Sequence, residues 1–402
     1  MIAQKKRDML GKSLPENSLI ILVGKTEQIR NGDVYYPFRQ DWDFLLLTGL
    51  DIPALVLLWI KKNGFVEWRI YSESITEKEK LWGTARLSHE ELRWISGIDD
   101  IREMQYASSD IRSLLLGVDH IGIRDQLTYL DEKNFLRKFQ LSQKRSSYIA
   151  LSSYIRPLRM YKTEEEVENI EKAVSITHQA YDKKKKNIQP WMYEYEIEAC
   201  IAWVYRANAT VESYPTIVAS GPNSCVMHYV RHDRKLEHGD HILIDFGAEY
   251  RGYSSDVTRV FFVGDPSARK KAIYMATKRV KDYAQSLIST QKSRKGHEGL
   301  VRIFLVEELR SLGLISWNIS SDEAMVLSRK YLPYKSLNHH LGLDTHDVGS
   351  GDDMIAPWMV LTCEPGIYIP EEGIGMRLED DLLITEDGYK NLSWKIPLLD
   401  FL

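Results

Sequence analysis

Four carboxylates embedded in apolar, strand-like runs constrain the second half of this sequence more than any other feature. They are Asp245 in ILIDFG, Asp256 before VTRVFFV, Glu364 in LTCEPG and Glu379 in MRLEDDLLI. A half-buried strand tolerates a carboxylate poorly unless the charge is paired or bound to a metal ion. Each carboxylate alone fits a solvated strand face, as LEDD does by itself, because charged side chains usually stay in water. Their concentration in one half of the chain instead predicts a shared site.

The stretch LNHHLGLDTHD (337–347) adds nitrogen ligands to this inventory, since it holds three of the eleven histidines of the chain. Carboxylate oxygens with a single imidazole form the kind of ligand set that suits Mn²⁺, Co²⁺, Fe²⁺ or Zn²⁺. Four converging carboxylates would repel one another strongly unless two divalent cations were bound. The residues therefore predict a divalent-metal site.

The pattern around the carboxylates predicts an α+β domain. The β-rich runs are 241–264, 358–369 and 374–388, and the segment 267–330 between them has mainly helical character. Sheet, helices and sheet in this order are typical of helices packed on curved antiparallel strands.

The first 150 residues alternate strand and helix patterns and predict a smaller α/β domain. NSLIILVG (17–24) is expected to be a short buried strand, and HIGIRD (120–125) another. Asn63-Gly64 lies between two strand-like runs, which is a strong hairpin signal.

The boundary between the two halves is marked by a break in the helical pattern. Pro157 interrupts one pattern, and Thr163 with Glu166 matches a capping box that begins a new helix. We therefore expect an N-terminal domain over residues 1–158 and a C-terminal domain over residues 159–402.

Composition argues against several classes of protein. The chain has 53 basic and 57 acidic residues and a net charge of -4, so it offers no strongly basic face to nucleic acid or an anionic membrane. Its cysteines, Cys200, Cys225 and Cys363, are few and odd in number, as in proteins with reduced thiols. The sequence shows neither the apolar core of a signal peptide nor a membrane-length apolar run of about 20 residues. We expect a cytoplasmic protein.

Five segments of the second half form a specific series. They are YPTIVASGPNSCVMHY (214–229), LIDFGAEYRGYSSDVTR (243–259), LNHHLGLDTHDVG (337–349), LTCEPGIYIP (361–370) and GIGMRLEDDLLIT (373–385). In order and spacing they resemble the pita-bread metallopeptidases, and specifically aminopeptidase P and prolidase. FRQDWDFLLLTGL (38–50) and LWGTARL (81–87) also resemble aminopeptidase P. The resemblance implies a pita-bread catalytic domain of the creatinase/aminopeptidase type, preceded by a creatinase-like N-terminal α/β domain.

The resemblance implies two metal ions and five ligands. The ligands would be Asp245, Asp256, His339, Glu364 and Glu379. In the family, the positions of Asp256 and Glu379 bridge the two metals. Asp245 completes one site, and His339 with Glu364 completes the other. The usual metal of the family is manganese, with cobalt and zinc as alternatives.

The resemblance also implies a reaction, in which the catalytic residues would be His228, His346 and Glu364. Two metals would lower the pKa of a shared water and supply hydroxide for attack on the first peptide bond. Glu364 would act as general base and later pass a proton toward the leaving nitrogen. His228 or His346 would help to hold the oxyanion. The expected substrates are peptides with proline at the second position.

The substrate-binding residues implied by the resemblance are His228, His346, Arg377, Tyr368 and Trp82. Arg377 equally fits a salt bridge to a neighbouring carboxylate, and Tyr368 a packed core tyrosine. Trp82 corresponds to a tryptophan that, in aminopeptidase P, reaches the active site of a neighbouring subunit; a buried core residue is the alternative. We therefore expect a homo-oligomer, either a dimer or a tetramer.

The remaining polar residues of 337–347 receive simpler interpretations. His340 occupies a position that is often aromatic in the family, so we interpret it as a packing residue. Asp344 and Asp347 are expected to support the ligands or to shape a turn, rather than to bind metal.

One position departs from the family pattern. The family's HGxxH reads Lys335-Ser-Leu-Asn-His339 here, so a lysine replaces the first histidine. An ammonium group cannot shuttle protons near pH 7 as imidazole does unless its pKa is strongly lowered. Lys335 could accompany an altered rate or specificity, bind the carboxylate of a short substrate, or mark a weakened enzyme.

Four functions compete on this sequence. A Xaa-Pro aminopeptidase is favoured by the FRQD and LWGTARL segments, and a Xaa-Pro dipeptidase would be favoured if Lys335 binds a substrate carboxylate. Hydrolysis of a C–N bond in a small molecule, as in creatinase, is a more distant option. A binding module that has lost catalysis is the fourth, although such modules usually lack metal ligands and all five are present here.

Overall fold

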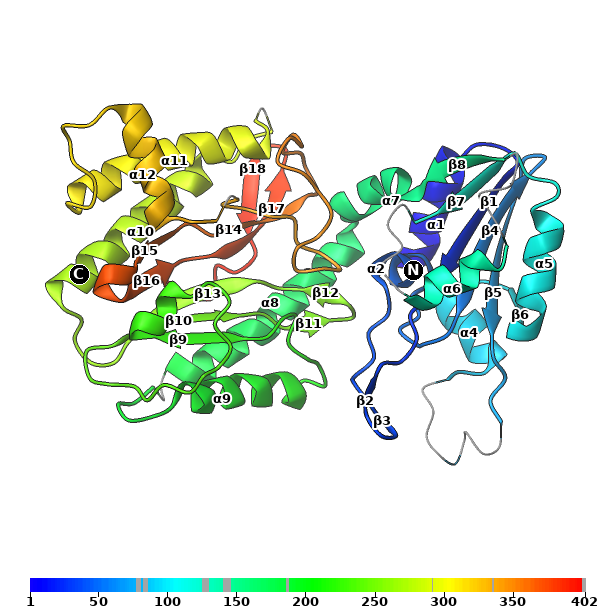
Figure 1. The fold of residues 1–402 in the computed structure, drawn as a ribbon, viewed down its shortest axis with the longest axis horizontal. Coiled ribbons are helices and arrows are strands. Elements are labelled where there is room, and N and C mark those ends of the chain that lie inside the picture. The colour runs from blue at the N-terminus through cyan, green and yellow to red at the C-terminus, as the bar shows by residue number, and fades with distance from the viewer. Residues whose placement is uncertain are drawn as a thin grey trace. The chain divides into compact units, whose positions relative to one another are not determined.

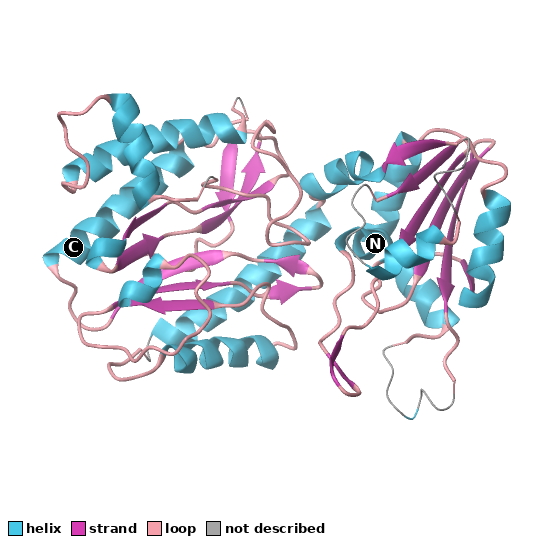
Figure 2. Ribbon diagram, viewed as in Figure 1, coloured by secondary structure: helices cyan, strands magenta, loops and turns pink. Residues whose placement is uncertain are grey.

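The computed structural model describes residues 1–76, 81, 86–124, 130–139, 146–185, 188–290, 292–334 and 336–399. They form two compact units, Met1–Leu158 and Arg159–Leu402. Figure 1 shows the ribbon in chain order, and Figure 2 distinguishes helices from strands in the same view. Within the described ranges, no helix has both the length and the apolar character needed to cross a membrane.

A six-stranded mixed sheet organises the N-terminal unit, with the strand order β6-β5-β4-β1-β7-β8. The strands are β1 (Ser18–Val23), β4 (Val56–Lys62), β5 (Phe65–Ser72), β6 (Asp100–Glu103), β7 (His120–Ile123) and β8 (Ser147–Ala150), with a separate hairpin of β2 (Ile29–Asn31) and β3 (Val34–Tyr35). The helices are α1 (Ile2–Ser13), α2 (Trp42–Thr48), α4 (His89–Ser96), η1 (Met104–Tyr106), α5 (Ala107–Leu114), α6 (Leu130–Arg137) and α7 (Leu151–Met160). Helices α1 and α5 lie on opposite faces of the sheet (Figure 1), so β1 is buried along its whole length, as predicted.

The hairpin expected at Asn63-Gly64 is confirmed. β4 and β5 pair in antiparallel register on either side of it, from Lys62 opposite Phe65 to Val56 opposite Tyr71. Asn63 and Gly64 both have positive φ, at 53° and 78°. That conformation is typical of the tight turns whose twist matches the twist of the flanking strands.

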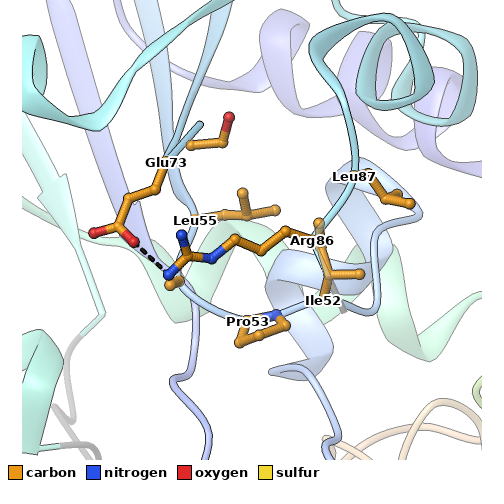
Figure 3. A pocket seen from close by; sticks show the side chains of 8 residues that line it. Ile52, Pro53, Leu55, Glu73, Arg86 and Leu87 are labelled. Carbon is orange, nitrogen blue, oxygen red and sulfur yellow. Dashed lines mark ion pairs between the residues drawn. The ribbon is translucent and has the colours of Figure 1, made fainter. Parts of the chain in front are cut away.

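The N-terminal unit also contains a small pocket beside the end of β5. Figure 3 shows its lining, in which the guanidinium of Arg86 lies 2.6 Å from the carboxylate of Glu73. The cavity volume is about 10 Å³, which corresponds to about one water molecule. This pocket is therefore too small for a substrate or cofactor.

The C-terminal unit packs helices on two groups of antiparallel strands, which confirms the α+β expectation. Its helices are α8 (Glu164–Lys185), α9 (Glu194–Ala207), η3 (Gly221–Cys225), α10 (Ala268–Ser286), α11 (Arg294–Ser311), α12 (Ser321–Tyr331) and η4 (Pro370–Glu372). Its strands are β9 (Ile217–Ser220), β10 (His241–Phe246), β11 (Glu249–Tyr250), β12 (Tyr253–Ser254), β13 (Val257–Phe262), β14 (Val360–Cys363), β15 (Gly366–Ile369), β16 (Ile374–Arg377), β17 (Asp380–Thr385) and β18 (Gly388–Asn391). In Figure 1 these strands lie between α8 and α9 on one side and α10, α11 and α12 on the other.

The segments that bear the carboxylates belong to paired strands. β10 lies between β9 and β13, and β17 lies between β14 and β18. Asp245 on β10 faces Thr258 on β13, and Cys363 on β14 faces Asp380 on β17. Apolar side chains of both strand groups and of α10 to α12 form one buried core. The acidic residues are therefore fixed on strands that are themselves packed.

The expected start of α8 and a break before it are confirmed, but the break lies at residues 161–163 and not at Pro157. The backbone N–H of Thr163 donates to the carboxylate of Glu166 at 2.7 Å, and that of Glu166 donates to the Thr163 hydroxyl at 3.4 Å, as in a capping box. Pro157 lies inside α7, which continues to Met160. A proline removes only one N–H donor, and burial of Leu158 on α7 holds the helix beyond it.

Candidate metal centre

Three of the five proposed ligands lie close enough to share one ion. Ligand atoms of Asp256, His339 and Glu379 all lie within 4.8 Å of one another. Nε2 of His339 is 3.3 Å from the carboxylate of Asp256 and 3.5 Å from that of Glu364. These residues come from the start of β13, the loop before β14, the end of β14 and the start of β17. The centre is therefore built by both groups of strands.

Tyr214 connects the fourth carboxylate, Asp245, to this group. Its hydroxyl lies 2.6 Å from an oxygen of Asp245 and 2.6 Å from an oxygen of Asp256. A phenol has a single proton, so it can donate to only one of the two carboxylates at a time. All five residues proposed from the sequence are thus brought into one contiguous cluster.

The backbone and the ring of His339 are both held in place. Its N–H donates to the Thr362 hydroxyl at 3.1 Å, and the N–H of Thr362 donates to its carbonyl at 2.9 Å. Nδ1 of the ring lies 3.1 Å from the carbonyl oxygen of His340. A proton on Nδ1 satisfies that carbonyl and leaves the lone pair of Nε2 pointing at the carboxylates. This is the tautomer that binds a metal through Nε2.

The electrostatics of the cluster favour a bound cation. Burial, with a smaller contribution from neighbouring Asp256, raises the pKa of Asp245 to about 6, even though Arg377 acts to lower it. Burial also raises the pKa of Glu364 to about 7, against the effect of His339, and raises that of Glu379 well above its usual range. Carboxyl groups that lie close together resist ionisation because their negative charges repel one another. A bound divalent cation offsets this repulsion and stabilises the ionised form. The donor set, carboxylate oxygens with one imidazole, fits such ions.

Arg377 and Tyr368 form the polar wall of the cluster. The guanidinium of Arg377 donates to Asp245 at 2.5 Å, to the Tyr368 hydroxyl at 2.9 Å and to the Thr258 hydroxyl at 3.0 Å. The Thr258 hydroxyl in turn donates to Glu379 at 2.6 Å. Arg377 thus makes the salt bridge to a carboxylate that the sequence allowed, and Tyr368 is buried, with its hydroxyl turned toward the cluster.

Of the two other candidate histidines, His346 lies beside His339. The ring of His346 meets the ring of His339 edge-on, with the centroids 4.4 Å apart. Burial and the neighbouring ring of His339 lower the pKa of His346. His228 is exposed, on the loop that follows η3. Two further candidates, Trp82 and Lys335, lie outside the described residues.

His340 and Asp347, two other polar residues of the histidine-rich stretch, make different contacts. The side chain of His340 is fully buried, and within the described chain neither of its ring nitrogens has a hydrogen-bond partner. Asp347 is paired with Arg159 at 2.6 Å and lies 3.7 Å from Lys162. Neither His340 nor Asp347 contributes a ligand atom to the group described above.

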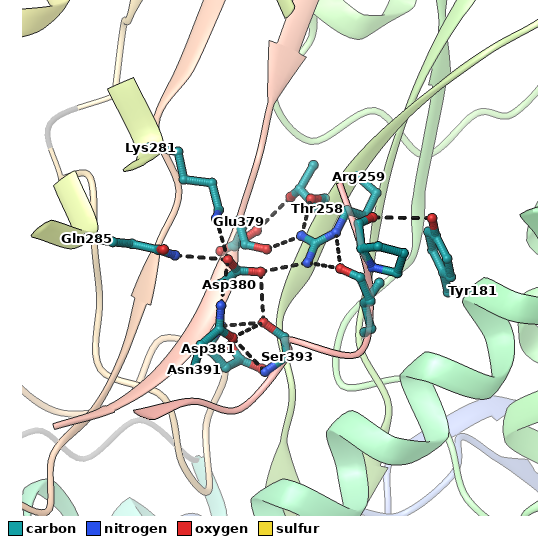
Figure 4. A network of polar contacts seen from close by, with 12 residues as sticks. Tyr181, Thr258, Arg259, Lys281, Gln285, Glu379, Asp380, Asp381, Asn391 and Ser393 are labelled. Atoms are coloured by element: carbon teal, nitrogen blue, oxygen red, sulfur yellow. Dashed lines mark hydrogen bonds and ion pairs between the residues drawn. The ribbon is translucent and has the colours of Figure 1, made fainter. Parts of the chain in front are cut away.

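A buried ionic network lies behind Glu379, where the LEDD pattern alone indicated a solvated face. That interpretation is wrong: Glu379, Asp380 and Asp381 are each at most 2% exposed. Figure 4 shows that Asp380 receives Arg259 at 2.6 Å and also contacts Lys281. Side chains that complete the shell are Gln285, Asn391 and Ser393. Arg259 also donates to the carbonyl oxygens of Thr258 and Glu379, so the network fixes the backbone of the cluster.

No pattern in the sequence pointed to Tyr214, Thr258 or Arg259 as part of the site. Tyr214 precedes an ordinary strand pattern, and its carboxylate partners are 31 and 42 residues away along the chain. Arg259 stands in an apolar run, and its partner Asp380 is 121 residues away. Only a polar residue inside an apolar strand, the criterion that found Asp245, could have marked Arg259 as a candidate.

Metal binding to this cluster should release protons and tighten as the pH rises from 5 to 8. The carboxyls of Asp245 and Glu364 have raised pKa values of about 6 and about 7, and crowding by Asp256 and Glu364 raises the pKa of His339 to about 9 despite its burial. A ligand must lose its proton to bind the ion. Titration calorimetry with Mn²⁺ at pH 6.5, in two buffers of different ionisation enthalpy, measures the release. Equal heats in both buffers would contradict this prediction.

The same shifts give the metal-free protein a defined dependence on pH. A carboxyl whose pKa is higher in the folded state favours folding below its unfolded value, near 4, and opposes it as the pH rises through the folded value. The Asp245 and Glu364 carboxyls therefore destabilise the metal-free fold as the pH rises through about 6 and about 7. Added Mn²⁺ should raise the melting temperature more at pH 8 than at pH 5.

Comparisons with known proteins agree with this geometry. Residues 168–386 match metallopeptidase family M24, and residues 3–121 match the aminopeptidase P N-terminal domain. Xaa-Pro aminopeptidase of Escherichia coli is 30% identical over 97% of this chain and 93% of its own. Xaa-Pro dipeptidase of Pyrococcus furiosus is 32% identical over 71% of this chain and 76% of its own.

Solved structures extend the likeness to the whole fold. Aminopeptidase P of E. coli in its low-pH form superposes with a TM-score of 0.92 at 28% identity, covering 99% of this chain and 96% of that one. A zinc-substituted form of the E. coli enzyme in complex with product gives the same values. The expected pita-bread fold of the C-terminal unit is thereby confirmed. The chain belongs to metallopeptidase family M24, in the branch of aminopeptidase P, with a pita-bread domain that follows an aminopeptidase P N-terminal domain.

Proposed function

We propose that this protein is a metal-dependent aminopeptidase that hydrolyses the first peptide bond of peptides with proline second. The observation that carries the proposal is the convergence of four carboxylates and His339 in one buried cluster. We propose as metal ligands Asp245, Asp256, His339, Glu364 and Glu379, with Mn²⁺ as the ion and Co²⁺ or Zn²⁺ as alternatives. We assign catalysis to residues 159–402, and residues 1–158 form the second domain.

Divalent metal bound to these ligands would supply a Lewis acid that acidifies water and polarises the scissile carbonyl. The residues of the chain supply the rest of the chemistry. Glu364, at the edge of the cluster, takes up the proton of the attacking water and returns it to the leaving nitrogen. We propose that His346 or His228 donates to the developing oxyanion.

Proline at the second position makes the leaving nitrogen a tertiary amide with no N–H. The nitrogen must therefore gain a proton before it can leave, which gives Glu364 its second role. Arg377 is held by Asp245, Tyr368 and Thr258, so it is a rigid part of the wall and not a mobile anchor. We propose that this wall and the two histidines shape the site for the pyrrolidine ring.

The first experiment compares Arg-Pro-Pro, Gly-Pro and Arg-Ala-Ala as substrates of the Mn²⁺-loaded protein, with products identified by mass spectrometry. We expect release of arginine from Arg-Pro-Pro, because the second residue is proline, and little release from Arg-Ala-Ala. Cleavage of Gly-Pro alone would establish a dipeptidase, the function for which Lys335 would bind the substrate carboxylate. No cleavage with metal bound would contradict both peptidase assignments and favour the binding module.

A further inference from the structure

We infer that Glu194 is the positioning residue that fixes the loop carrying His228 beside the candidate metal centre. This loop, residues 221–234, is called the His228 loop below. The inference rests on the proposed function, because His228 matters there as a group that touches substrate. Glu194 lies in the first turn of α9, outside the cluster of candidate ligands.

Glu194 is fully buried, and donors from both ends of the His228 loop converge on its carboxylate. At the near end, the backbone N–H and the hydroxyl of Ser220 donate to it at 2.7 and 2.6 Å. The Tyr229 hydroxyl donates at 2.7 Å from the middle of the loop. At the far end, the backbone N–H of Arg234 donates at 3.1 Å. The side chain of Asn223 adds a contact at 3.2 Å.

The hydrogen bonds to the Glu194 carboxylate therefore hold this loop in place, as backbone hydrogen bonds hold a strand in a sheet. Beyond η3 the loop has no helix or strand of its own up to residue 234. A carboxylate without its proton can only accept, and five donors around Glu194 match that capacity. The N-terminus of α9 adds a favourable dipole for the negative charge. Burial of this charge is tolerated because it is satisfied in this way.

The anchor also sets the direction of His228. Tyr229 is buried at 6% exposure with its hydroxyl on Glu194, whereas the neighbouring His228 is exposed. While Tyr229 is held inward by Glu194, the neighbouring His228 stays on the exposed side of the loop. If the anchor is lost, His228 samples positions away from the cluster.

A structural role alone and a positioning role have different kinetic signatures. When only a fraction of molecules holds His228 in place, the apparent affinity for substrate falls in proportion to that fraction. Bound substrate restores the loop, so kcat is affected less than KM. Metal affinity is unchanged, because no ligand is attached to Glu194 or to the His228 loop. A general loss of packing would instead reduce metal affinity and kcat together.

Tyr229→Phe is the first test variant, since it removes one donor to Glu194 and keeps the ring. Glu194→Gln is the second, because it keeps the size of the side chain and places an amide where donors converge. Tyr331→Phe is the matched control. Tyr331 lies on α12, away from the loop, and is buried at 9% exposure, as Tyr229 is at 6%. Its hydroxyl donates to the Leu314 carbonyl at 3.1 Å. We expect KM for Arg-Pro-Pro to rise roughly tenfold in the first two variants, with wild-type values in the control.

Hydrogen exchange provides a readout that does not depend on peptidase activity. In both test variants, amides of residues 221–234 should exchange at least about tenfold faster than in the wild type, and those of residues 337–347 should not change. Mn²⁺ affinity, measured by calorimetry, should also stay within about twofold of the wild type.

The two proposals can fail separately. A wild-type protein that cleaves no Xaa-Pro peptide, together with faster exchange in the His228 loop of the variants, would overturn the proposed function and leave the anchor established. Wild-type KM in an active Glu194→Gln variant would overturn the positioning role, whatever the exchange shows. Unchanged exchange in the loop would overturn the anchor itself, and a parallel loss of metal affinity would show that Glu194 only supports the fold.

Discussion

Asparagine in place of Asp256 should abolish binding of one metal equivalent and reduce kcat/KM for Arg-Pro-Pro at least about a thousandfold. The exchange keeps the size of the side chain but replaces one anionic oxygen by an amide nitrogen. Asp256 lies between Tyr214 and His339, at 2.6 and 3.3 Å, so no other carboxylate of the cluster can take its place. Metal content after gel filtration and hydrolysis rates with saturating Mn²⁺ are the measurements.

The matched control for this prediction is Asp265→Asn. Asp265 is an exposed aspartate on the connection between β13 and α10, and the same chemical change there should leave metal content and rate at wild-type values. Asp256→Asn protein with full metal content and a rate within tenfold of the wild type would remove Asp256 from the ligand set. Circular dichroism of both variants verifies that the fold is retained.

The second large effect is expected in stability and not in chemistry. Asp380→Asn should lower the free energy of unfolding by about 3–5 kcal/mol, because it leaves Arg259 and Lys281 as buried cations without their anion. Urea unfolding of the metal-free protein, followed by circular dichroism, measures the loss. Glu171→Gln is the control, since Glu171 pairs with Lys390 at 2.5 Å on the surface, where water screens the interaction. The control should unfold as the wild type does.

The pH dependence of the difference in unfolding free energy between the wild type and Asp380→Asn shows whether charge causes that difference. Burial acts to raise the pKa of Asp380, but Arg259 and Lys281 outweigh it and hold the pKa well below its usual range. A carboxyl with a lowered pKa stabilises the fold above its unfolded value, near 4, and loses this effect as the pH falls further. The gap between wild type and Asp380→Asn should therefore be full at pH 7 and shrink below about pH 4. A gap that does not change with pH would point to packing instead of charge.

The local sequence pattern was sufficient to predict a structural feature where the interacting residues are close together in the sequence. The turn at Asn63-Gly64 and the Thr163–Glu166 box were predicted correctly because each depends on residues no more than three positions apart. The metal cluster was recognisable because carboxylates inside apolar strands are costly and therefore informative. Its assignment to individual metals came from resemblance and stays a prediction.

The sequence could not reveal contacts between distant segments. Asp380 stands in LEDD, a pattern that fits a surface as well as a core, and the decision depends on Arg259 and Lys281, which lie far away in sequence. Glu194 likewise looks like a helix-start carboxylate, and nothing near it shows that donors 26 to 40 residues further on will surround it. Burial of a charge is decided by its partners, and the chain brings those together only on folding.

The network behind Glu379 has a consequence for the order in which the protein can be made. Arg259 bonds to the carbonyl of Ile396 at 2.9 Å, and Tyr181 bonds to that of Pro397 at 3.2 Å. During synthesis, neither contact can form until the segment beyond β18 has left the ribosome. The N-terminal unit contains its own core and can fold first. The candidate metal centre therefore acquires its final form only after residues 396 and 397 have been synthesised, and later than the core of the N-terminal unit.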